Sequence, residues 1–115
     1  MKYATVIARN DKTRKLLEYI LVVNEGWAVI QPINFPSTDV KLGDDSHEFK
    51  VNVENATHNR ICEANAVFIV VDNLEEGIPK YMEKYILTAQ INHKEVHIRY
   101  IAPSELTRLE KIWEE

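Results

Sequence analysis

The chain has 115 residues, of which 45% are hydrophobic and 28% are charged, and its formal net charge is −4. This balance excludes the disordered class, whose chains combine few apolar residues with high net charge, and it predicts one folded domain over residues 1–115. The negative charge argues against a nucleic-acid partner, because binding to phosphates requires a clustered basic surface.

The first third of the chain has the pattern of a strand, a helix and a second strand. Residues 3–9 are apolar and β-branched, which favours a strand. From Asp11, the expected cap, apolar side chains recur at helical spacing up to Gly26. Residues 27–31 are again apolar and stop at Pro32, as expected of a buried strand. Two strands joined by about fifteen residues predict a parallel βαβ unit. The helix is expected to bury Leu16, Leu17, Ile20, Leu21 and Val23.

The middle of the chain holds an irregular stretch and then an ambiguous one. Residues 33–45 carry turn residues without a regular period, so we predict a loop, either a lid over a ligand or a passive insertion. In residues 46–64, apolar side chains alternate as in a strand and also recur as in a helix. We favour a helix capped near Ser46, because a crossover element must precede the next parallel strand.

The last third predicts two more strands and two helices. Residues 66–71 are apolar on both faces, which is typical of a central strand. Residues 77–79 then begin a helix that runs to about Asn92, with a proline in its first turn. Residues 95–101 alternate in polarity, which favours an edge strand, and Ser104 can cap a final helix. The third helix would bury Ile78, Met82, Tyr85, Ile86 and Ala89, and the final one Leu106, Leu109 and Trp113.

The alternation of strands and helices predicts an α/β fold. We expect a doubly wound three-layer sandwich with a four-stranded parallel sheet in the order 2-1-3-4. A ligand of such a sheet lies beyond the carboxyl ends of the strands that flank the switch in order, here strands one and three. The residues that converge there are Ala8, Arg9, Asn10 and Asp11 from the first loop and Asp72, Asn73 and Gly77 from the third.

These polar residues allow two interpretations. They could bind an anionic or sugar-bearing molecule at the helix starts, with Asp72 accepting hydrogen bonds from ribose hydroxyls. They could instead only cap helices and form turns, as Asp and Asn commonly do. Tyr81 and Tyr85 lie one helical turn apart beside the same edge and could stack on a base, or pack against the sheet.

One stretch of the chain resembles a known family. Residues 61–73, with Ala64-Asn65-Ala66-Val67 before an apolar strand and Asp72, are followed by Gly77, a helix through Ala89 and then Lys94-Glu95-Val96. This order resembles the nucleoside 2-deoxyribosyltransferases, whose pattern is "ADAV", strand, Asp, glycine loop and helix before "GKPV". Residues 3–8 and 26–32 match that family's first two strands. The resemblance implies a flavodoxin- or Rossmann-like domain that binds a nucleoside or nucleotide-like ligand, in a family where oligomers are common.

Members of that family cleave N-glycosidic bonds with a glutamate nucleophile, and the matching position here is Tyr85. The nearest carboxylate, Glu83, is two residues away and so about 200° around the helix. The resemblance therefore implies a binding domain without the family's glutamate. Two alternatives stay open. One is an N-glycosidic hydrolase or transferase in which Glu83 or Asp72 is catalytic, and the other is a non-catalytic interaction scaffold.

The remaining features predict neither a metal nor a cofactor. No histidine has a recognised metal-ligand spacing to another His, Cys or acidic residue. Cys62 could form a reactive pair with His58, although a buried structural cysteine is commoner.

The single cysteine and the absence of a secretory pattern favour the cytoplasm. The longest apolar run, residues 66–71, is far below the roughly 20 residues that span a bilayer, so no membrane partner is expected. Half-exposed Tyr100 and Ile101 on an edge strand could support a homo-oligomer.

Overall fold

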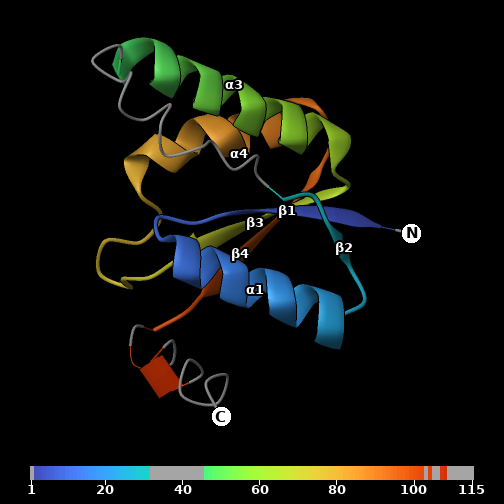
Figure 1. The fold of residues 1–115 in the computed structure, drawn as a ribbon, viewed down its shortest axis with the longest axis vertical. Helices are drawn as coiled ribbons and strands as arrows, with labels where there is room; N and C mark the ends of the chain where they lie inside the picture. Colours follow the sequence, from blue (N-terminus) through green and yellow to red (C-terminus); the bar gives the residue numbers. More distant parts are fainter. Residues whose placement is uncertain (1, 32–45, 103, 105–106, 109–115) are drawn as a thin grey trace.

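The computed structural model describes residues 2–31, 46–102, 104 and 107–108, without the side chains of residues 46–52. The described strands form one sheet in the order β2-β1-β3-β4, and every pair of neighbours is parallel. Helix α1 covers one face of the sheet, and α3 and α4 cover the other (Figure 1). The predicted α/β fold and strand order are therefore confirmed. The elements are β1 (Tyr3–Ile7), α1 (Asp11–Asn24), β2 (Ala28–Val29), α3 (Ser46–Glu63), β3 (Ala66–Val71), a 3-10 turn (Lys80–Met82), α4 (Glu83–Ile91) and β4 (Glu95–Tyr100).

Strand β3 is the centre of the core, and all six of its residues are buried. Phe68 and Val70 pack on the α1 side, together with Leu17 and Leu21 of that helix. Val67 and Ile69 pack on the opposite side, against side chains of α3 and α4. Because successive side chains of a strand point to opposite faces, a strand covered on both faces must be apolar throughout. This explains why residues 66–71 are the longest apolar run of the chain.

Helix α1 begins one residue earlier than its predicted cap implied. Asn10, in extended conformation, is the cap, and its Oδ1 accepts a hydrogen bond of 2.7 Å from the Lys12 N–H. Asp11 is the first helical residue, where its negative charge still interacts favourably with the positive end of the helix dipole. Gly26 follows the helix with φ of 75°, as a helix-ending glycine does. Val23 is 58% exposed, contrary to prediction, because it lies two residues beyond Leu21 and therefore on the opposite side of the helix.

Strand β2 differs most from prediction. It covers only Ala28 and Val29, both half-buried, instead of a buried strand over residues 27–31. Strand β2 lies at the sheet edge, so it has one neighbouring strand, β1. The pairing of the two strands ends with the hydrogen bond from the Ile30 N–H to the Ala4 carbonyl. Strand β1 likewise ends at Ile7 and not Arg9, where its pairing with β3 stops.

The ambiguous segment is helical, which confirms the interpretation that we favoured, and α3 begins at Ser46. Helix α4 starts later than predicted, because Pro79 is extended and the 3-10 turn at Lys80 comes first. Residues before a proline disfavour helical conformation, so Ile78 lies outside the helix and is exposed. Met82, Tyr85 and Ala89 are buried as expected, and Ile86 packs beside them. Loop 33–45, and Leu106, Leu109 and Trp113 of the predicted final helix, lie outside the described residues.

Strand β4 lies at the sheet edge, as predicted, and the exposure of Ile98 and Tyr100 agrees with that position. Ile101, expected to be half-exposed, is buried in the core on the α1 side. The His97 ring stacks on Phe68 with centroids 4.7 Å apart, and the Arg99 guanidinium lies 5.3 Å from the same ring. No helix in the described part of the chain is long and apolar enough to cross a membrane.

Candidate functional site

The carboxyl ends of β1 and β3 meet at one edge of the sheet. These strands are adjacent and parallel over Ala4–Ile7 and Ala66–Ile69, so Arg9 and Asp72 follow neighbouring strand ends. The connection after β1 runs through α1 on one face, and the connection after β3 runs through α4 on the other (Figure 1). This divergence is the switch point at which doubly wound sheets bind ligands.

A group of four polar side chains gathers at this switch point: Arg9, Asp72, Glu76 and Tyr81, which we call the edge cluster. Arg9 Nη2 donates a hydrogen bond of 2.7 Å to Glu76 Oε1, and both side chains are more than 40% exposed. Arg9 also interacts with the Tyr81 hydroxyl and with the charge of Asp72. The hydrogen bond to Glu76 raises the pKa of Arg9. Burial raises the pKa of Tyr81, and Arg9 opposes this shift.

The other predicted edge residues have structural roles. Asn10 caps α1, and Asn73 Oδ1 accepts the N–H groups of Glu75 and Glu76 at 2.9 and 3.3 Å. Gly77 has φ of 71° and donates its N–H to the Asn73 carbonyl, which closes the turn that carries Glu76. Asp11 is well exposed, with its Oδ1 3.6 Å from Arg14 Nε. For these residues the cap-and-turn interpretation describes the observed geometry, and the turn places Glu76 beside Arg9.

The two tyrosines differ in exposure, although they lie one turn apart. Tyr81 is 47% exposed and belongs to the edge cluster. Tyr85 is only 8% exposed, its hydroxyl interacts with Thr57, and its ring centroid lies 5.1 Å from that of His58. Burial raises the pKa of Tyr85. Glu83 is exposed in the first turn of α4, with no polar partner among the described residues.

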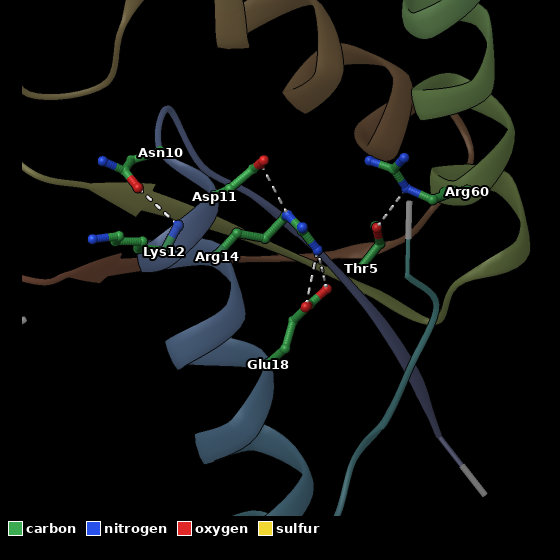
Figure 2. Close-up of polar contacts among 7 residues, drawn as sticks. All are labelled: Thr5, Asn10, Asp11, Lys12, Arg14, Glu18 and Arg60. Atoms are coloured by element: carbon green, nitrogen blue, oxygen red, sulfur yellow. Dashed lines mark hydrogen bonds and ion pairs between the residues drawn. The ribbon is translucent and has the colours of Figure 1, made fainter. Parts of the chain in front are cut away.

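A second polar group, missed by sequence reasoning, is buried beside β1 (Figure 2). It consists of Thr5, Arg14, Glu18 and Arg60, which we call the buried cluster. Arg14 Nη1 donates to Glu18 Oε1 and Oε2 at 3.0 and 3.1 Å, and these two residues are 9% and 4% exposed. Arg60 Nε donates a hydrogen bond of 3.3 Å to Thr5 Oγ1. Figure 2 shows the arginines reaching toward Thr5 from α1 and α3.

The buried cluster forms where β1 lacks a described neighbouring strand. Strand β2 pairs only with Tyr3 and Ala4, so no described strand flanks the outer edge of β1 from Thr5 onward. Burial raises the pKa of Glu18, and the charge and hydrogen bonds of Arg14 oppose that shift. Burial lowers the pKa of Arg60, and the nearby charge of Arg14 lowers it further. The group thus holds two guanidiniums and one buried carboxylate, and the exposed Asp11 carboxylate lies 3.6 Å from Arg14 Nε.

No family model matches the chain, and no curated protein matches it significantly. Among solved structures, the chain is similar to the CMP N-glycosidase BcmB from Clostridium botulinum, with 12% identity over 98% of each chain and a TM-score of 0.47.

The remaining candidates lie away from the switch point. Cys62 is exposed, contrary to the expectation of a buried thiol, because the buried face of α3 carries Thr57 and Ile61 instead. His58 Nδ1 lies 2.8 Å from the Thr88 hydroxyl, so its ring joins α3 to α4. Within the described residues, no group of three His, Cys, Asp or Glu side chains could hold a metal ion.

Proposed function

We propose that this chain binds a small nucleoside- or nucleotide-like ligand at the carboxyl edge of β1 and β3. The observation that carries the proposal is the edge cluster, in which a guanidinium, two carboxylates and a half-exposed ring come together from three segments. Asp72 and Glu76 can accept hydrogen bonds from sugar hydroxyls, and the exposed ring of Tyr81 offers a stacking surface for a base. The Arg9–Glu76 pair is exposed, and such pairs contribute little to stability, so a ligand can replace it.

This proposal assigns binding without a glutamate nucleophile. Tyr85 stands where the deoxyribosyltransferase pattern has its glutamate, and its hydroxyl is engaged with Thr57. A phenol of raised pKa stays neutral at pH 7, whereas attack on an anomeric carbon requires an ionised group.

Ligand-induced stabilisation tests the proposal. Nucleosides, nucleotides and related cofactors would be added to the protein while its thermal midpoint is measured. A ligand at 100 times its dissociation constant adds about 2.7 kcal/mol to the free energy of unfolding, which corresponds to a shift on the order of ten degrees. The substitution Arg9→Gln should remove most of this shift. Arg99→Gln, which breaks a comparable pair with Glu25 at the other end of α1, should leave the shift intact. Absence of any shift across the panel would reject binding and favour a scaffold role.

A second candidate function, cleavage of N-glycosidic bonds, is favoured by the position of Asp72. Its half-buried carboxylate lies beside Arg9 and Tyr81, whereas Glu83 is exposed on α4. Base release by the wild type should fall at least about a hundredfold in Asp72→Asn, the usual contribution of an acid–base group, and should persist in Glu83→Gln. Chromatography of the released base measures both rates. The opposite pattern would assign the chemistry to Glu83.

A further inference from the structure

The two arginines of the buried cluster are not equally satisfied. Arg14 is paired with Glu18 through two hydrogen bonds. Arg60 makes one hydrogen bond, to Thr5, and no ion pair within the described part of the chain. A guanidinium carries five N–H donors in a planar fork, so most donors of Arg60 have no described acceptor. Arg60 is therefore the arginine of the cluster that has no ion-paired carboxylate among the described residues.

The surroundings of Arg60 match the needs of an oxyanion. Thr5 brings a hydroxyl on a fully buried side chain, and the Tyr85 phenol lies close enough to interact electrostatically with Arg60. Arg60 is half-buried, so part of its side chain still reaches solvent. A charge in a partly buried site is costly unless an opposite charge compensates it.

We infer that Arg60 binds the phosphate group of a small ligand between β1 and α3, with the Thr5 hydroxyl beside it. The planar fork of Arg60 can donate two parallel hydrogen bonds to phosphate oxygens, which is the geometry that favours arginine over lysine in such sites. The phosphate could be free inorganic phosphate or the phosphate of a nucleotide. Arg14, already ion-paired with Glu18, contributes long-range attraction.

This phosphate site is formed by residues outside the edge cluster. Tyr85 interacts electrostatically with both Arg60 and Tyr81. If both proposals hold, the ligand is a nucleotide rather than a nucleoside. The two can fail separately, because inorganic phosphate tests Arg60 alone and an uncharged nucleoside tests the edge cluster alone.

The experiment is a calorimetric titration of the intact protein with inorganic phosphate at constant ionic strength. We expect saturable binding with a dissociation constant of about 1 mM or below. Arg60→Gln should weaken it by about tenfold to a hundredfold, the usual effect of losing a charge-assisted hydrogen bond. Arg60→Lys, which keeps the charge but not the fork, should give an intermediate affinity. Arg99→Gln is the matched control and should bind as the wild type does.

Nucleoside 5′-monophosphates and the matching nucleosides form the second arm. If the site takes the phosphate of a nucleotide, the monophosphate should bind at least about tenfold more tightly than its nucleoside, and Arg60→Gln should remove the difference. Equal affinities together with saturable inorganic phosphate would assign the site to the free ion. Absence of saturable phosphate binding by the wild type overturns the proposal, and this result does not depend on any variant folding. Undiminished phosphate binding by Arg60→Gln overturns it as well.

Discussion

Arg14→Met should lower the free energy of unfolding by about 3 to 5 kcal/mol at pH 7, because it leaves the buried Glu18 carboxylate without its partner. Glu18 is 4% exposed and receives both of its hydrogen bonds from Arg14 Nη1. Methionine fills a similar volume, so the loss would come from the unpaired charge rather than from a cavity. For a domain of this size the thermal midpoint should fall by more than about ten degrees.

The loss of unfolding free energy in Arg14→Met should depend on pH. Burial raises the pKa of Glu18 above its ordinary value of 4.5, and without Arg14 the pKa rises further. A raised pKa means that the folded protein holds the proton more tightly than the unfolded chain. The stability supplied by protonated Glu18 is complete below about 4.5 and is lost as the pH rises through the folded-state pKa. The deficit of Arg14→Met relative to the wild type should therefore be smaller at pH 5 than at pH 8.

Urea unfolding of both proteins at several pH values measures this deficit. The double variant Arg14→Met/Glu18→Leu is the control, since a buried ion pair replaced by apolar residues often costs little. It should recover most of the lost stability and show no extra pH dependence. A deficit of equal size at every pH, or a double variant as unstable as the single one, would contradict the role of the unpaired carboxylate.

Phe68→Ala is the second substitution with a large expected effect, a loss of about 3 to 5 kcal/mol. Phe68 is 1% exposed at the centre of β3, and Trp27 meets it edge-on with ring centroids 5.4 Å apart. His97 stacks on it, and Arg99 lies over the same ring. Removal of the ring would leave a cavity and three neighbours without their contact surface.

Chemical denaturation measures the loss of unfolding free energy in Phe68→Ala, and the slope of that free energy against denaturant concentration should be unchanged. Phe68→Leu is the matched control, because it keeps an apolar side chain of intermediate volume and should cost about 1 to 2 kcal/mol. A loss below about 1 kcal/mol in Phe68→Ala would show that the ring is not the centre of this half of the core.

The fold could be predicted because its strongest signals are local. Residues 66–71 are apolar on both faces, which only a doubly covered strand requires, and a parallel pair needs a crossover, which decided residues 46–64 in favour of a helix. Strand β2 was predicted too long because apolar composition does not reveal that a strand lies at an edge. The α1 cap was misplaced by one residue because Asn10 and Asp11 are both good capping residues.

The edge cluster could be predicted only in part. The switch-point rule places Arg9 and Asp72 at one edge, and helical spacing brings Tyr81 near it. Glu76 was missed because it lies in a turn whose path depends on Asn73.

The buried cluster was missed because Arg14 and Glu18 form an i, i+4 pair, which normally faces solvent. One signal was available, since residues 14, 17, 18 and 21 share one side of the helix and two of them are core leucines. Arg60 gave no signal, because its partner Thr5 is 55 residues away in the sequence.

The central claim is that a nucleotide-like ligand binds at the carboxyl edge of β1 and β3. The most direct test is a titration of isotopically labelled protein with a nucleoside monophosphate, followed through its backbone amide resonances. We expect the largest shifts at Arg9, Asn10 and residues 72–77, and small shifts at residues 94–96, which lie at the opposite end of the sheet. Shifts confined to that opposite end, or no shifts at saturating ligand, would contradict the proposed site.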